Sequence, residues 1–445
     1  MRASQDRVAI RGHGLTNASQ NQLGRKVLAA AAAFGTYFCM YAFRKPFTAA
    51  TFSGQTLAGM ELKDVLVLAQ LVGYMSSKFI GVRVVAEMPR HRRALSIVGL
   101  IVIAELALVG FAVVPFILKP ACLLLNGLCL GMIFGLVLAY LEGQQQTEAL
   151  AAGLCASFII SSGAVKSVGS YLMQTHGVSE FSMPWKTGAL FFPALLAFVW
   201  LLDQSPAPSA QDQRLRSERT VMNRTQRVEF FRAYAPGLLA LLFVYAALTI
   251  IRTLRDDFSV ELWQDMGVAE EPSVFARSET LVAVVVMLLN ACLIFVVSNM
   301  QALRITTGLM TAGFALAVGA TLGQWSGSLP PFAFMVLFGI GLYIPYVAFH
   351  TTLFERLIAS SRRHGNLGFL MYLADATGYL CYAAIVVLKI LVPPPNGILP
   401  VFRSYLLVTS LCCIAALLGA IVYFQRVLTP DSTAAAVPTE SGPHA

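Results

Sequence analysis

Charged side chains lie inside long apolar stretches of the sequence, where they could recognise ions. A charged residue at the centre of a membrane costs about 2.5–3.5 kcal/mol on insertion scales, so each must face a partner or a wet cavity and is a candidate functional residue. The basic members are Arg44, Lys45, Lys78, Lys166, Arg252 and Arg255, and the acidic members are Glu105, Asp256, Asp257, Glu279 and Asp375.

Two arginines recur in the same local pattern. Tyr37 lies seven residues before Arg44, and Tyr245 lies seven residues before Arg252. A guanidinium stays charged at any physiological pH and binds phosphate or carboxylate through two parallel hydrogen bonds. We predict that both arginines bind an anion, most naturally a tetrahedral oxyanion, and that both tyrosines offer hydroxyls. The alternative is that Arg252 pairs with Asp256 one turn later and that Arg44 extends outward to the interface.

The remaining intramembrane charges leave alternatives open. Lys166 either binds the anion or pairs with a carboxylate such as Asp375 or Glu105. Asp375 either recognises a cationic or hydroxyl group of the substrate or compensates Lys166. We favour the interpretation that the ammonium of Lys78 extends toward the membrane surface.

Lys45, Asp257 and Glu279 form a second candidate set, a coupling network in which the lysine bridges two acids. A pair of this kind can break and re-form between conformational states. Removing one partner of a buried pair costs about 3–5 kcal/mol, which is enough to bias a conformational equilibrium and also enough for a purely structural role.

The apolar stretches that carry these charges predict a polytopic, all-α membrane protein. Hydrophobic residues make up 57% of the 445 residues and charged residues 12%, which excludes a soluble protein. At about 20 residues per span, the apolar content suffices for about twelve transmembrane helices. The predicted spans are 27–50, 64–85, 94–115, 119–141, 149–173, 186–202, 235–256, 275–298, 303–325, 331–354, 366–391 and 403–425.

A long hydrophilic stretch divides these spans six to six. The predicted parts are a tail (1–26), a six-helix half (27–202), a basic linker (203–233), a second six-helix half (234–426) and a disordered tail (427–445). This layout is typical of the major facilitator fold, in which the substrate lies between the halves. Lysine and arginine gather in loops on the side of the N-terminus, so we expect both termini to be cytoplasmic and the protein to lie in a bacterial inner membrane.

Several classes of function have no residues to support them. The sequence contains no Walker loop, HExxH motif or Ser-His-Asp arrangement, so we expect no enzyme. The eight cysteines lack CxxC spacing and lie in apolar stretches, so we expect neither a metal nor a cofactor. The net charge of +9 is spread over short loops, which indicates membrane orientation rather than nucleic-acid binding. The expected partners are a small anionic substrate and the lipid bilayer, with the protein a monomer.

Two short motifs stand in the first and second predicted spans: Arg-Lys-x-Phe in the segment from Tyr41 to Phe47, and Ser77-Lys78-Phe79. Both are similar to motifs of the organophosphate:phosphate antiporter family of the major facilitator superfamily, which the chain resembles. The segment from Phe243 through Arg252 to Phe258 resembles its seventh span, and Glu279 lies where that family has a glutamate. The resemblance implies that Arg44 and Arg252 bind phosphate and that Lys45, Asp257 and Glu279 form one network.

Two positions depart from that family. Lys166-Ser-Val-Gly169 stands where the family has a histidine before Asn-Val-Gly, and the usual Gly-x-x-x-Asp-Arg loop after Gly81 is absent. The departures suggest a distant branch. The predicted function is exchange of a small organophosphate for inorganic phosphate by alternating access. A transporter-like sensor of a phosphorylated ligand and a carboxylate transporter are the alternatives.

Overall fold

The computed structural model describes residue 24 and residues 27–428, except for 142–146, 206–223, 269–270, 293–295, 297, 362–365 and 394–396. The described part is helical apart from one short antiparallel hairpin, β1 (Thr56–Leu57) paired with β2 (Met60–Glu61). Most of the predicted N-terminal tail, the centre of the basic linker and nearly all of the predicted C-terminal tail lie outside the described residues.

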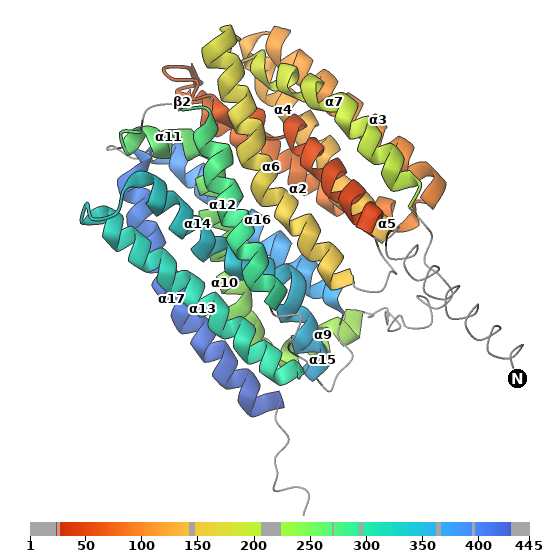
Figure 1. Ribbon diagram of the computed structural model, residues 1–445, viewed down its shortest axis with the longest axis vertical. Coiled ribbons are helices and arrows are strands. Elements are labelled where there is room, and N and C mark those ends of the chain that lie inside the picture. The colour runs from red at the N-terminus through yellow and green to blue at the C-terminus, as the bar shows by residue number, and fades with distance from the viewer. Residues whose placement is uncertain are drawn as a thin grey trace, which may run out of the picture.

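The helices form two groups that lie side by side, drawn from red to yellow-green and from green to blue in Figure 1. The first group, residues 27–205, contains the first helix (Val27–Phe43), η1 (Tyr41–Phe43), η2 (Pro46–Ala49), α2 (Leu62–Glu87), α3 (Arg90–Val113), η3 (Phe116–Leu118), α4 (Lys119–Leu130), α5 (Ile133–Leu141), α6 (Thr147–His176) and α7 (Met183–Asp203). The second group, residues 224–428, contains α9 (Arg224–Ala233), α10 (Ala235–Asp257), α11 (Ser259–Asp265), α12 (Ser273–Cys292), α13 (Asn299–Trp325), α14 (Pro331–Ala348), η5 (Phe349–Leu353), α15 (Phe354–Ser360), α16 (Leu367–Leu391) and α17 (Ile398–Leu428).

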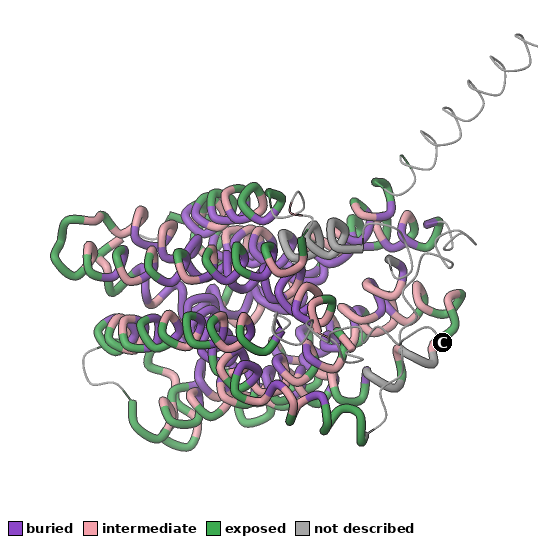
Figure 2. The backbone as a smooth tube through the Cα atoms, turned by 90° about the horizontal axis from the view of Figure 1, so that it is seen from below, coloured by how far each residue is buried: buried purple, intermediate pink, exposed green. Residues whose placement is uncertain are grey.

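Nine helices of the described part are long and apolar enough to cross a membrane. In α10 and in the stretch Pro331–Ser360, 78% of the apolar window is buried, against 28–50% in the other seven. Figure 2 shows the same contrast as a buried centre and an exposed periphery. Large apolar side chains remain exposed on that periphery, among them Leu95, Val113 and Leu391. Such a surface suits lipid and not water, and the chain is an integral, multi-pass membrane protein.

Three predicted spans are interrupted in the structure. The first, predicted to continue to residue 50, gives way at Tyr41 to the 3₁₀ segments η1 and η2, and Pro46 at the start of η2 cannot donate the hydrogen bond that would continue an α-helix. The fourth divides into α4 and α5 after Gly131. The tenth passes from α14 through the π-helix η5 into α15. π-Helical turns are uncommon and often mark functional sites.

Glycines bring α2 and α4 into backbone contact. A Cβ atom added at Gly127 would lie 2.2 Å from the backbone oxygen of Gln70, and one added at Gly73 would lie 2.0 Å from the backbone oxygen of Leu124. Any side chain at these positions would force the helices apart, so glycine allows the close approach that the spacing of Gly127 and Gly131 predicts. This contact fixes the position of α2, which contributes two side chains to the site described below.

Candidate functional site

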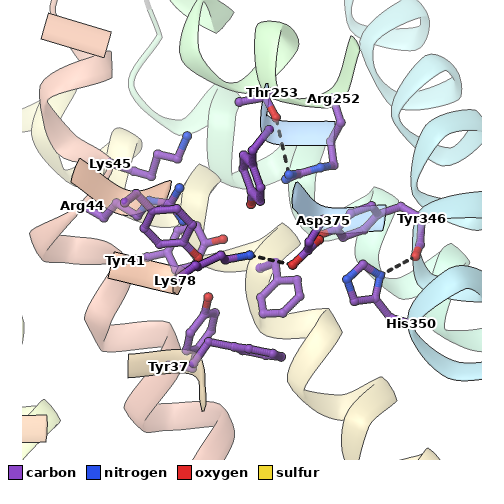
Figure 3. A pocket seen from close by; sticks show the side chains of 14 residues that line it. Tyr37, Tyr41, Arg44, Lys45, Lys78, Arg252, Thr253, Tyr346, His350 and Asp375 are labelled. Atoms are coloured by element: carbon purple, nitrogen blue, oxygen red, sulfur yellow. Dashed lines mark hydrogen bonds and ion pairs between the residues drawn. The ribbon is translucent and has the colours of Figure 1, made fainter. Parts of the chain in front are cut away.

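A pocket that is partly open to solvent lies between the two helix groups. The first helix and α2, α5 and α6 line one side of it, and α10, α14, η5 and α16 line the other. Its charged lining residues are Arg44, Lys45, Lys78, Arg252 and Asp375 (Figure 3). Aromatic rings fill most of the remaining wall, Tyr37 and Tyr346 among them.

Arg44 and Arg252 reach this pocket from opposite groups. Each is only 8% exposed, and neither forms an ion pair with a carboxylate in the described part of the chain. Their guanidinium carbons instead lie over aromatic rings, Arg44 3.7 Å from the centroid of Tyr74 and Arg252 4.4 Å from that of Tyr346. The Nε atom of each arginine is buried without a hydrogen-bond partner. The alternative pairing of Arg252 with Asp256 is not found.

The break in the first helix positions Arg44. Ending the α-helix there frees backbone carbonyls, and side chains of neighbouring helices bind them: Gln70 donates to the carbonyl of Arg44 at 2.9 Å, and Asn126 donates to that of Phe43 at 2.9 Å. Gln70 also donates to the Oδ1 atom of Asn126 at 2.9 Å, so the two amides hold each other. These bonds anchor the backbone from which the guanidinium projects.

Lys45 and Lys166 meet a pair of aspartates at the end of α10. The Nζ atom of Lys45 lies 2.5 Å from both the Oδ2 atom of Asp256 and the Oδ1 atom of Asp257. The Nζ atom of Lys166 lies 2.6 Å from the Oδ1 atom of Asp256 and 3.1 Å from the hydroxyl of Ser259. Two lysines of the first group and two aspartates of the second therefore form a continuous set of ion pairs between the groups.

This network includes Lys166 and Asp256, which were not predicted members, and lacks Glu279, which was. Lys166, expected to bind the anion or to pair with a carboxylate such as Asp375 or Glu105, pairs with the carboxylate of Asp256 and does not line the pocket. Glu279, expected to contact Lys45, lies 2.6 Å from Arg255 instead. Both differences arise from the rotation of α10, which turns Arg255 toward α12 and Asp256 toward α6.

Asp375 and Lys78 form an ion pair inside the pocket, 2.6 Å between Oδ2 and Nζ. Lys78 was expected to extend toward the membrane surface, and Asp375 was not expected to meet it. Tyr245, expected to offer its hydroxyl to the cavity, donates it to the Oδ1 atom of Asp375 and supports the carboxylate from outside the pocket lining. Tyr37 does line the pocket.

His350 is a pocket residue that the sequence interpretation missed. It lies on the π-helix η5, its Nδ1 atom 2.9 Å from the backbone oxygen of Tyr346 and its Nε2 atom 3.5 Å from the hydroxyl of Tyr245. A histidine inside the apolar stretch 331–354 was a visible signal, and the reasoning applied to the charged residues would have found it.

Comparison with known proteins identifies the family and the fold. Residues 46–427 match a family described as a family of unknown function, DUF5690. The chain belongs to this family. No curated protein matches the chain. The crystal structure of a D-xylose-proton symporter resembles this member of DUF5690 with a TM-score of 0.58 at 14% identity, over 89% of this chain and 96% of that one. This likeness shows that the chain has a fold like that of major facilitator transporters. The closer resemblance to the organophosphate:phosphate antiporters stays a prediction.

Proposed function

We propose that the protein is a secondary transporter, not an enzyme, that exchanges a small organophosphate or related anion for inorganic phosphate by alternating access. One observation carries this proposal: Arg44 and Arg252, from opposite helix groups, face one pocket without a carboxylate partner among the described residues. Buried charges in proteins are paired, and leaving one unpaired is costly. An anion in the pocket would supply the missing partner.

A phosphate monoester suits this site better than a carboxylate. It carries about two negative charges at neutral pH and three terminal oxygens, so it can accept forked hydrogen bonds from guanidiniums on two sides. A carboxylate has one charge and two oxygens, and a single arginine already satisfies it through two parallel bonds. A carboxylate transporter is therefore the second candidate.

Exchange follows from the electrostatics of the empty site. Without a ligand, closing the two groups over the pocket confines two guanidinium charges in a medium of low dielectric constant. A bound anion relieves that repulsion, so the loaded carrier should change state readily and the empty carrier slowly. The proposal includes twelve spans in two six-helix halves, both termini in the cytoplasm of a bacterial cell, and a monomer as the working unit.

Efflux of labelled phosphate from proteoliposomes tests the proposal. Efflux should be fast with phosphate or a phosphate ester outside and slow without either. Equal rates in the two conditions would contradict obligatory exchange. Phosphate binding without any efflux would identify a sensor, and efflux stimulated only by carboxylates would identify a carboxylate transporter. A panel of labelled anions in the same liposomes identifies the class of substrate.

A further inference from the structure

The ammonium group of Lys78 occupies a site built for a cation. Its Nζ atom lies 2.6 Å from the carboxylate of Asp375, 4.5 Å from the ring centroid of Tyr379 and 5.3 Å from that of Tyr74. A carboxylate together with aromatic faces is the combination that binds organic ammonium groups in proteins. Two tyrosine rings and one acid thus surround a primary ammonium that belongs to the protein itself.

This ion pair is less enclosed than the Lys45–Asp257 pair, which also joins the two groups. The side chains of Lys78 and Asp375 are 20% and 26% exposed, whereas those of Lys45 and Asp257 are 5% and 8% exposed. Both Lys78 and Asp375 line the pocket. A lysine ammonium on a flexible four-carbon stem can leave such a site without breaking packed structure.

The carboxylate is held in place independently of Lys78. The hydroxyl of Tyr245 donates a hydrogen bond to its Oδ1 atom, while Lys78 contacts Oδ2. A neutral hydroxyl orients the carboxylate and leaves its charge in place. If Lys78 moved away, Asp375 would stay in the pocket as a fixed negative charge.

Tyr74 joins this cation site to the arginine site. The guanidinium carbon of Arg44 lies 3.7 Å from the ring centroid of Tyr74, and the ammonium of Lys78 lies 5.3 Å from the same centroid. The two cations are therefore no farther apart than the sum of these distances. One small molecule could place an anionic group against Arg44 and Arg252 and a cationic group against Asp375.

We infer that the organic substrate is a compact zwitterion, a phosphate or phosphonate that carries an ammonium group, and that its ammonium takes the place of the Lys78 Nζ atom. The inference rests on the proposed function for the anionic end of the site. The ammonium would pair with Asp375 and lie against Tyr74 and Tyr379. A substrate without an amine would leave the Lys78–Asp375 pair intact and use only the arginines.

Binding of two phosphate esters to the purified protein tests this assignment. Phosphoethanolamine and ethyl phosphate share the anionic group and differ in the ammonium, so the ratio of their dissociation constants isolates the cation site. We expect the wild type to prefer phosphoethanolamine by about tenfold. Lys78→Met removes the internal competitor and should increase that preference. Asp375→Asn should reduce it to about twofold or less, and Arg277→Lys, a change on the exposed surface, should leave it as in the wild type.

Two results would overturn the inference. One is equal affinity for the two esters in both the wild type and the Lys78→Met variant. The other is a Lys78→Met variant that loses affinity equally for inorganic phosphate and for both esters, because Lys78 would then be a third anion ligand. If the wild type binds no phosphate compound, the proposed function fails. Binding of labelled methylammonium then tests the cation site by itself. Binding of methylammonium to Lys78→Met and its loss in Lys78→Met with Asp375→Asn would support the site, and no binding to either would refute it.

Discussion

Lys389 on α16 binds Asp64 at the start of α2, with its Nζ atom 2.6 Å from Oδ1 and 2.8 Å from Oδ2. Lys63, which directly precedes Asp64, pairs with Glu261 on α11. Both lysines lie near the ring of Phe258, at 4.4 Å and 5.7 Å from its centroid. These pairs join the two helix groups at the end where β2 and α11 lie, away from the C-terminal end of α17 (Figure 1). They therefore tie the two groups together at that end.

Removing these pairs should favour opening at that end. In a cysteine-free background with Thr253→Cys in the pocket, Lys389→Gln leaves the buried carboxylate of Asp64 without this partner. The variant should raise the rate of labelling by a membrane-impermeant thiol reagent by at least about fivefold, which corresponds to about 1 kcal/mol. The reagent is applied from the side opposite the termini. Arg277→Gln is the control, because it breaks an exposed pair with Glu271 inside one group. Unchanged labelling, even with Lys63→Gln added, would show that the pairs do not control access.

Phosphate binding should require both arginines. Arg44→Lys or Arg252→Lys keeps the charge but loses the forked geometry, so the affinity for inorganic phosphate should fall by at least about tenfold, about 1.4 kcal/mol. Isothermal titration calorimetry of the purified variants with inorganic phosphate measures this affinity. Arg277→Lys is the matched control on an exposed arginine. Wild-type affinity in both lysine variants would remove these residues from the site.

The Lys45 network should show coupling between its members. Lys45→Met leaves Asp257 buried with the hydroxyl of Tyr382 as its remaining hydrogen-bond partner within the described structure. The dominant penalty is the unpaired charge, about 3–5 kcal/mol, so Lys45→Met with Asp257→Asn should be more stable than Lys45→Met alone. Thermal unfolding in detergent measures the recovery. Strictly additive losses would show that the two residues do not interact.

The contact between α2 and α4 should depend on Gly127. Gly127→Ala would place a Cβ atom 2.2 Å from the backbone oxygen of Gln70, so the helices must separate at a cost of about 1–3 kcal/mol. Because α2 carries Tyr74 and Lys78, affinity for phosphate esters should fall together with the unfolding temperature. Gly99→Ala on α3 meets no atom within 4 Å and serves as the control. Equal stability of the two variants would contradict this packing.

The sequence sufficed for properties that depend on each segment alone. Apolar content and the cost of a charge in a membrane act on one helix at a time. The multi-pass fold and the location of Arg44, Arg252 and Asp375 at a pocket could therefore be predicted without coordinates. The interruption of the tenth span could not be predicted in this way, because the π-turn η5 depends on packing against other helices.

The tertiary structure decided which charges meet. Lys45 and Asp257 are 212 positions apart, and Lys78 and Asp375 are 297 apart. Whether two such groups pair depends on the depth and rotation of each helix in the bundle. A rotation of one residue, about 100°, turns a side chain from one neighbour to another. For that reason the sequence identified Lys166, Glu279 and Tyr245 as polar residues inside the membrane but not the residue that each one contacts. Their pairing with Asp256, Arg255 and Asp375, respectively, is known only from the packed helices.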